Sequence, residues 1–92
     1  MANHSFPTRT ELQVLAILRD SPEGLSGLQI VKRGIARGSV YILLSRLEDK
    51  GFVTVDRNEP AYPGLNRSHY RISGEGRRVV AFADDLSAAV HV

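Results

Sequence analysis

The feature that most restricts the fold of this 92-residue sequence is a change of hydrophobic period near residue 51. Before it, four apolar residues recur at positions i, i+3, i+4 and i+7, namely Val40, Leu43, Leu44 and Leu47. This spacing predicts a helix over residues 37–50 with one buried face. Gly51 suits the end of that helix, and residues 52–57 then alternate as in a half-buried strand. The chain therefore has to pack a helix and a strand around one core.

Two shorter helices are predicted before residue 37. Thr8 and Glu11 have the spacing of a capping box, which predicts a helix over residues 8–20. Ser26 and Gln29 repeat that spacing and predict a second helix over residues 26–33, and Gly34 suits the position after its end. Residues 21–24 have the composition of a turn.

The second half of the chain predicts a hairpin and a last helix. Residues 69–72 alternate again, with Tyr70 and Ile72 on the side expected to face the core. A polar segment with two prolines separates them from the first strand, and Ser73 suits the N-cap of a helix to the C-terminus. The order is helix, helix, helix, strand, strand, helix, a mainly α fold of the winged helix-turn-helix type. We expect a flexible tail at 1–7, the winged domain at 8–72, and a helix packed on it at 73–92.

The last helix has an apolar face that can be buried against its own domain or against a second copy. A chain of this length buries only about 60–65% of its unfolded surface, and pairing with a second copy adds stability. The pattern by itself leaves open which of the two surfaces covers this face. Its residues are Val79, Phe82, Ala83, Leu86, Ala89 and Val90.

Charge is unevenly distributed along the sequence. Residues 32–78 carry ten Lys or Arg against five acidic residues, whereas the remainder carries two against five. A basic middle section indicates a face for a polyanion, although solubility alone explains such charges equally well. The sequence has no cysteine, which excludes disulfides and fits a reducing compartment. Without a signal peptide or a membrane-spanning run, we expect a cytoplasmic protein.

In the predicted fold, the third helix is the element that fits the major groove of double-stranded DNA. Arg37 at its start is expected to donate to a guanine, although an arginine there can also be merely solvated. The small residues Gly38 and Ser39 allow the helix start to approach phosphate. Tyr41 offers a hydroxyl to a phosphate, with a half-buried position against the hairpin as the alternative. Ser45 lies on the same exposed face.

The hairpin provides a second set of candidate contacts. Residues on it are expected to touch phosphates or an adjacent minor groove. For His69 the absence of any DNA contact is an equal alternative, and Tyr70 is expected in the core. The candidate residues of the wing are Asn66, Arg67, His69 and Arg71.

Residues 12–77 resemble the PadR-like family of winged-helix regulators in three stretches. Gly27-Leu28-Gln29-Ile30 is similar to the family's Gly-Tyr-Glu-Ile. Gly38-Ser39-Val40-Tyr41, with the Arg46-Leu47-Glu48 that follows, is similar to its Gly-Thr-Leu-Tyr motif and recognition helix. The segment from Arg67 to Ser73, with Gly76 and Arg77, resembles its wing exit. The resemblance covers about seven-tenths of the chain.

The resemblance implies a dimer through the C-terminal helix, repression of a nearby promoter, and DNA contacts by residues 38–41 and by the wing around Arg67. Three features depart from it. Leu28 replaces a tyrosine, and Ala36 stands where a Ser or Thr caps the recognition helix, a loss typically of about 1 kcal/mol. The last helix is short and lacks tryptophan, so the resemblance does not carry over a small-molecule effector.

No enzymatic site is predicted. The three histidines, at positions 4, 69 and 91, have no carboxylates at metal-ligand spacing. Gly34 to Gly38 lacks the lysine of a phosphate-binding loop, and Asp84 and Asp85 suit a solvated helix face. We expect no catalytic residue, no metal and no cofactor.

The resulting interpretation is a homodimeric, sequence-specific regulator of transcription, acting as a repressor. The third helices of the two subunits, about 34–36 Å apart, would contact the two halves of an inverted repeat in double-stranded DNA. The alternative is a winged-helix module that binds another protein through its wing or last helix and does not recognise a DNA sequence.

Overall fold

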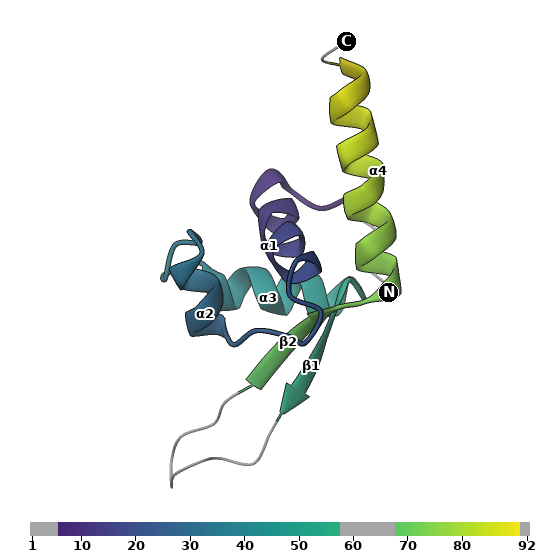
Figure 1. Ribbon diagram of the computed structural model, residues 1–92. Helices are drawn as coiled ribbons and strands as arrows, with labels where there is room; N and C mark the ends of the chain where they lie inside the picture. The colour runs from purple at the N-terminus through teal and green to yellow at the C-terminus, as the bar shows by residue number, and fades with distance from the viewer. Residues whose placement is uncertain (1–5, 58–67, 91–92) are drawn as a thin grey trace, which may run out of the picture.

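The computed structural model describes residues 6–57 and 68–90. Its elements follow the predicted order, and the two strands form an antiparallel hairpin (Figure 1). They are α1 (Arg9–Arg19), α2 (Gly27–Lys32), α3 (Val40–Asp49), β1 (Val53–Arg57), β2 (Ser68–Ile72) and α4 (Gly74–Val90). The predicted winged helix-turn-helix fold is thereby confirmed.

Side-chain caps start three of the four helices, as the sequence predicted. The Thr8 hydroxyl accepts from the Glu11 amide at 3.2 Å, and the Glu11 carboxylate accepts from the Thr8 amide at 2.9 Å. Ser26 and Gln29 make the equivalent pair of bonds at the start of α2. The Ser73 hydroxyl accepts from an amide in the first turn of α4 at 3.0 Å. Each cap satisfies amides that the helix itself leaves unpaired.

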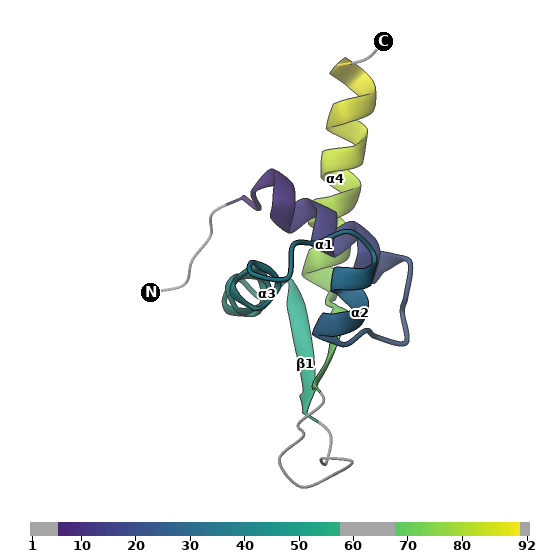
Figure 2. The same cartoon turned by 90° about the vertical axis from the view of Figure 1, so that its left-hand side faces the viewer.

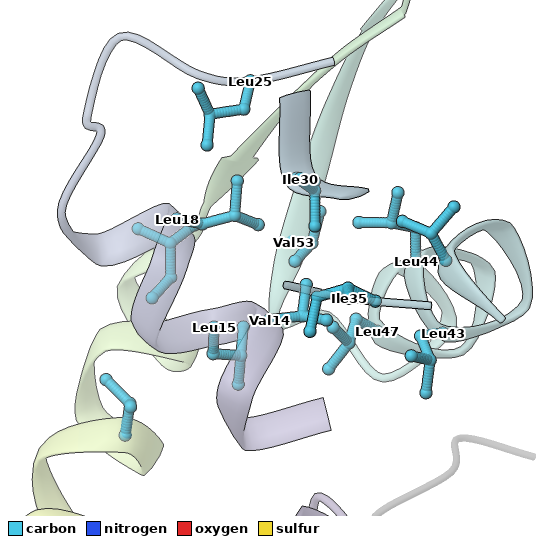
Figure 3. Packing of buried hydrophobic residues seen from close by; sticks show 13 residues of the cluster. Val14, Leu15, Leu18, Leu25, Ile30, Ile35, Leu43, Leu44, Leu47 and Val53 are labelled. Carbon is cyan, nitrogen blue, oxygen red and sulfur yellow. The ribbon is translucent and has the colours of Figure 1, made fainter. Parts of the chain in front are cut away.

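Apolar side chains from all six elements form one core (Figure 3). The predicted stripe of α3 is fully part of it, and Tyr70 packs against its edge. On α2, Leu28 is exposed. A helix of six residues turns fewer than two times, so α2 buries only Gly27 and Ile30. The buried apolar residues are Val14, Leu15, Leu18, Leu25, Ile30, Ile35, Val40, Leu43, Leu44, Leu47, Val53, Ile72 and Val80.

The hairpin is tied to the helix-turn-helix unit by backbone bonds. In its register Val53 pairs with Ile72 and Asp56 with His69. Leu25, just before α2, forms an antiparallel bridge with Tyr70, with N–H to O distances of 3.0 and 2.8 Å. The sequence predicts a turn at residues 21–24 but gives no sign of the bridge at Leu25. The bridge fixes the chain entering α2 to β2.

The hairpin and α4 project from opposite sides of the helical body (Figure 1). The view in Figure 2 is nearly along α3 and shows this helix beside the start of β1. The start of α4 packs tightly on the residue before β1, since a Cβ on Gly76 would lie 2.2 Å from the carbonyl oxygen of Phe52. The starts of β1 and α4 therefore lie close together, and from there the hairpin and α4 run in opposite directions (Figure 1).

One ion pair joins α1 to the end of α3. Lys50 Nζ lies 2.8 Å from Glu11 Oε1, and the two side chains are only 6% and 1% exposed. Burial raises the pKa of the Glu11 carboxyl, but bonds from Lys50 and the Thr8 amide, with the charges of Lys50 and Arg46, outweigh it. The pKa of Glu11 is therefore below its ordinary value.

A second ion pair joins α1 to α4. Arg19 Nη1 lies 2.6 Å from Asp84 Oδ2, and the Asp84 side chain is 61% exposed. Hydrogen bonding to Asp84 raises the pKa of Arg19 further. Asp84 lies on an exposed helix face, as expected, and α1 in addition brings an arginine alongside it.

Candidate nucleic-acid interface

The helix expected in the major groove begins three residues later than the sequence suggested. Helix α3 starts at Val40, and residues 37–39 form a turn before it. The carbonyl of Ala36 accepts from the amides of Ser39 and Val40 at 3.0 and 3.1 Å. Ser39 makes no side-chain capping bond. The predicted start at residue 37 is wrong because Ala36 offers no capping oxygen and glycine at position 38 disfavours helix.

All five candidate residues in this region are exposed, which leaves them available to a ligand. The first three lie in the turn and the last two on α3. Their contacts with DNA stay predictions. The residues are Arg37, Gly38, Ser39, Tyr41 and Ser45.

The ring of Tyr41 lies over the first residue of α2. A Cβ on Gly27 would come within 2.5 Å of Tyr41 Cε1 and 2.7 Å of its hydroxyl oxygen. Only glycine fits at that position without moving the ring. Tyr41 thus packs on α2, and it remains mostly exposed and not half-buried. This contact brings the starts of the two helices together.

The wing candidates are in three different situations. Asn66 and Arg67 lie outside the described residues. His69 is partly buried and stands opposite Asp56 in the hairpin register. Arg71 is exposed, but its Nε donates to the carbonyl of Glu23 at 3.2 Å and its Nη2 lies 3.5 Å from Asp56 Oδ2. Arg71 therefore braces the hairpin against the turn before α2.

The apolar face of α4 is divided between two surroundings. Val80, which the sequence analysis did not select, is buried in the core, and Val79 is partly buried against it. Val79 therefore packs on its own domain. Phe82 is 57% exposed, Leu86 is similarly exposed, and Ala83 is intermediate. Ala89 and Val90 belong to the helix, but their side chains lie outside the described part.

The segment before α1 lies against α4. The rings of Phe6 and Phe82 meet edge to face with centroids 6.1 Å apart, and Pro7 is buried. Of the expected flexible tail, residues 6 and 7 are thus packed, and residues 1–5 lie outside the described range. Phe6 enlarges the exposed apolar surface on α4.

Nothing in the described ranges suggests a metal site or a membrane span. Among residues 6–57 and 68–90, no three His, Asp or Glu side chains are grouped to hold an ion. Within the same ranges, no helix has the length and apolar character needed to cross a bilayer.

The sequence model of the transcriptional regulator PadR-like family matches residues 14–81, which span α1 to the middle of α4. The chain belongs to the PadR-like family. This family comprises DNA-binding regulators of transcription and not enzymes. Among functionally curated proteins none matches the sequence.

Solved structures share the fold. A PadR family regulator from Clostridium difficile R20291 superimposes with a TM-score of 0.78 at 18% identity, covering 91% of this chain and 92% of that one. The PcaV transcriptional regulator from Streptomyces coelicolor gives a TM-score of 0.78 at 26% identity, covering 99% and 64%. Streptococcus pneumoniae FabT, solved in complex with DNA, gives 0.72 at 20% identity, covering 91% and 57%. The PadR-like chain spans less than two-thirds of PcaV and FabT.

Proposed function

We propose that this PadR-like protein is a homodimeric transcriptional repressor that binds an inverted-repeat operator in double-stranded DNA, in the cytoplasm. The observation that carries the proposal is the opposed placement of two surfaces. The hairpin projects from one side of the helical body that contains α3, whereas the outer part of α4, which carries the exposed Phe82 and Leu86, projects from the other (Figure 1). A dimer joined through α4 therefore keeps both α3 helices uncovered.

In this proposal the turn before α3 and the first turns of α3 supply the groove contacts. Arg37 donates to a guanine, since an exposed arginine can make two bonds to its major-groove edge. Gly38 and Ser39 allow backbone amides to approach a phosphate. Tyr41 donates its hydroxyl to a phosphate from its position against α2, with Ser45 farther along the same side.

The wing supplies contacts to the backbone or minor groove. We assign these to Asn66, Arg67 and His69. Arg71 already binds Asp56 and the carbonyl of Glu23, so its main role in the proposal is to hold the wing in position. Removing Arg67 should then weaken all sequences alike and lower the salt dependence by about one released ion.

The dimer contact uses the outer part of α4. Phe82 and Leu86 present apolar area that the protomer itself leaves in water, and Phe6 adjoins them. Covering such area is favourable by roughly 25 cal/mol for each Å² removed from water. Ala83, Ala89 and Val90 belong to the proposed contact, whereas Val79 serves the core of its own domain.

The test is selection of bound sequences from a random duplex pool, followed by salt titration of the selected duplex by fluorescence anisotropy. An inverted-repeat motif and steep loss of affinity with salt are expected. Replacing Arg37 by alanine should cost about 1–3 kcal/mol and relax the preference at one base pair. An unchanged preference in that variant would contradict the role of Arg37. Failure to enrich any motif would refute the proposal and favour a protein-binding module.

A further inference from the structure

The side of α3 that points most directly away from the core includes the candidate residue Ser45, but its other members were not predicted to contact DNA. Ile42, Ser45 and Asp49 follow one another at i, i+3 and i+7, and all three are exposed. With 3.6 residues per turn they lie opposite the buried stripe. Figure 3 shows Leu43, Leu44 and Leu47 of that stripe directed into the core. Tyr41 is turned toward α2, so Ile42 occupies the middle of the outward face.

Ile42 is unusual among the isoleucines of this chain. Its side chain is 56% exposed, whereas Ile30, Ile35 and Ile72 are buried and Ile17 is partly buried. An exposed isoleucine contributes little to the stability of the fold, because its apolar area remains in water. Position 42 thus has an apolar side chain that is not part of the core of its protomer.

The position of Ile42 along α3 indicates what it meets. It is the third residue of the helix, and the N-terminal part of a recognition helix is the part that contacts base edges. In the major groove the apolar group offered by a base is the 5-methyl of thymine. A branched aliphatic side chain cannot donate or accept, so against other base edges it leaves polar atoms without partners. Thymine is therefore the base that Ile42 favours.

We propose that Ile42 is a specificity-determining residue that contacts the 5-methyl group of one thymine in each half-site. This inference rests on the proposed function, since it requires α3 to lie in the major groove. It adds an apolar contact to the polar ones assigned to Arg37 and Tyr41.

The experiment uses the duplex selected from the random pool. Each thymine of the half-site is replaced in turn by deoxyuridine in both half-sites, which removes only the 5-methyl group. Affinities of the full chain are measured by fluorescence anisotropy at one salt concentration. One position should lose about fourfold in affinity for each half-site, the effect expected for burial of one methyl group.

The variant Ile42→Ala identifies which side chain meets that methyl group. It should bind the thymine and deoxyuridine duplexes equally and unfold at the same urea concentration as the parent chain. Leu28→Ala is the matched control, because Leu28 is also an exposed apolar residue but lies on α2. That variant should keep the full preference for thymine.

Three results would overturn the inference while leaving the proposed function intact. They are a selected half-site without thymine, a motif that tolerates deoxyuridine at every position, and a thymine preference that persists in Ile42→Ala. If no motif is enriched at all, the proposed function fails and the inference fails with it.

Discussion

Helices α3 and α4 are each joined to α1 by an ion pair, but the two pairs differ in their exposure to solvent. The pair between Glu11 and Lys50, at the end of α3, is almost completely buried. The pair between Arg19 and Asp84, on α4, is largely exposed. A buried pair resists screening by salt, whereas an exposed pair contributes little. The orientation of α3 is therefore set firmly within one protomer, and that of α4 less so.

The apolar faces of the two helices differ in the same way. All four stripe residues of α3 are buried in the core of their own domain. On α4 the start is anchored by Val80, while Phe82 and Leu86 remain exposed. The apolar face of α3 is thus covered within the protomer, whereas the outer half of α4 leaves apolar side chains exposed, where the proposed dimer would cover them.

The largest effect is expected from Lys50→Met, which tests whether α3 depends on its buried pair. Removing the lysine leaves the Glu11 carboxylate buried without its partner, which typically costs about 3–5 kcal/mol. Urea denaturation at neutral pH measures this loss. Lys32→Met is the control, because Lys32 is exposed and its removal should have little effect. A double change with Glu11→Gln should recover most of the stability.

Acid titration tests the same prediction, because the contribution of Glu11 to stability should change with pH in opposite directions in the parent chain and in Lys50→Met. In the parent chain the pKa of Glu11 is lowered, so its contribution is complete above the unfolded-state value and is lost as pH falls through the folded-state value. In Lys50→Met burial should instead raise the pKa of Glu11. That variant should gain stability, relative to the parent, as pH falls toward the range where Glu11 protonates. Parallel stability curves for the two chains would contradict the assignment.

Phe82→Ala tests whether the outer half of α4 needs a partner. Truncating a large aromatic side chain at the centre of an interface typically costs 2 kcal/mol or more, so dimer dissociation should be favoured by about that amount for each copy. Sedimentation equilibrium over a range of concentrations measures the change. Leu28→Ala removes exposed apolar area from α2 and should leave the association constant alone. An equal dissociation constant in parent and variant would exclude α4 as the dimer contact.

Gly76→Ala tests the fixed start of α4. The new Cβ would meet the carbonyl oxygen of Phe52, so α4 or β1 has to shift at a cost of about 1–3 kcal/mol. Gly74→Ala is a close control, because its Cβ would meet only the end of the Arg78 side chain at 3.7 Å. Urea denaturation should separate the two variants. Equal stabilities would show that the start of α4 is loosely packed.

The smallest effect is expected from Asp84→Asn. Exposed ion pairs contribute about 0–1 kcal/mol, and salt reduces this further. Thermal unfolding at low and high salt measures the difference, with Asp85→Asn on the same helix as control. A loss of stability as large as that of Lys50→Met would contradict the conclusion that the exposed pair contributes less than the buried one.

The fold was largely predictable because its signals are local. Two capping boxes, the stripe of α3 and the cap at Ser73 each depend on residues within one or two turns. The bridge between Leu25 and Tyr70 was missed because its partners are 45 positions apart and its bonds involve only backbone atoms. No side-chain pattern marks such a contact.

The candidate interface was less predictable for a related reason. The sequence shows which residues of α3 share a face, but the neighbour that covers part of that face comes from elsewhere in the chain. The ring of Tyr41 can lie against α2 because Gly27 has no side chain there, which leaves Ile42 in the middle of the outward face. Likewise, the partners of Arg71 lie on another strand and in a turn. DNA contacts of Arg37, Ser45 and the wing stay predictions.

The bridge between Leu25 and Tyr70 also has an evolutionary consequence. Because its hydrogen bonds join main-chain atoms, substitutions at either position can preserve them as long as the new side chain fits the core. The relative placement of the wing and the helix-turn-helix unit is thus inherited independently of the residues that face DNA. Under the proposed function, descendants of such a protein could acquire new operators by exchanging exposed side chains on α3, while the spacing between α3 and the wing is conserved.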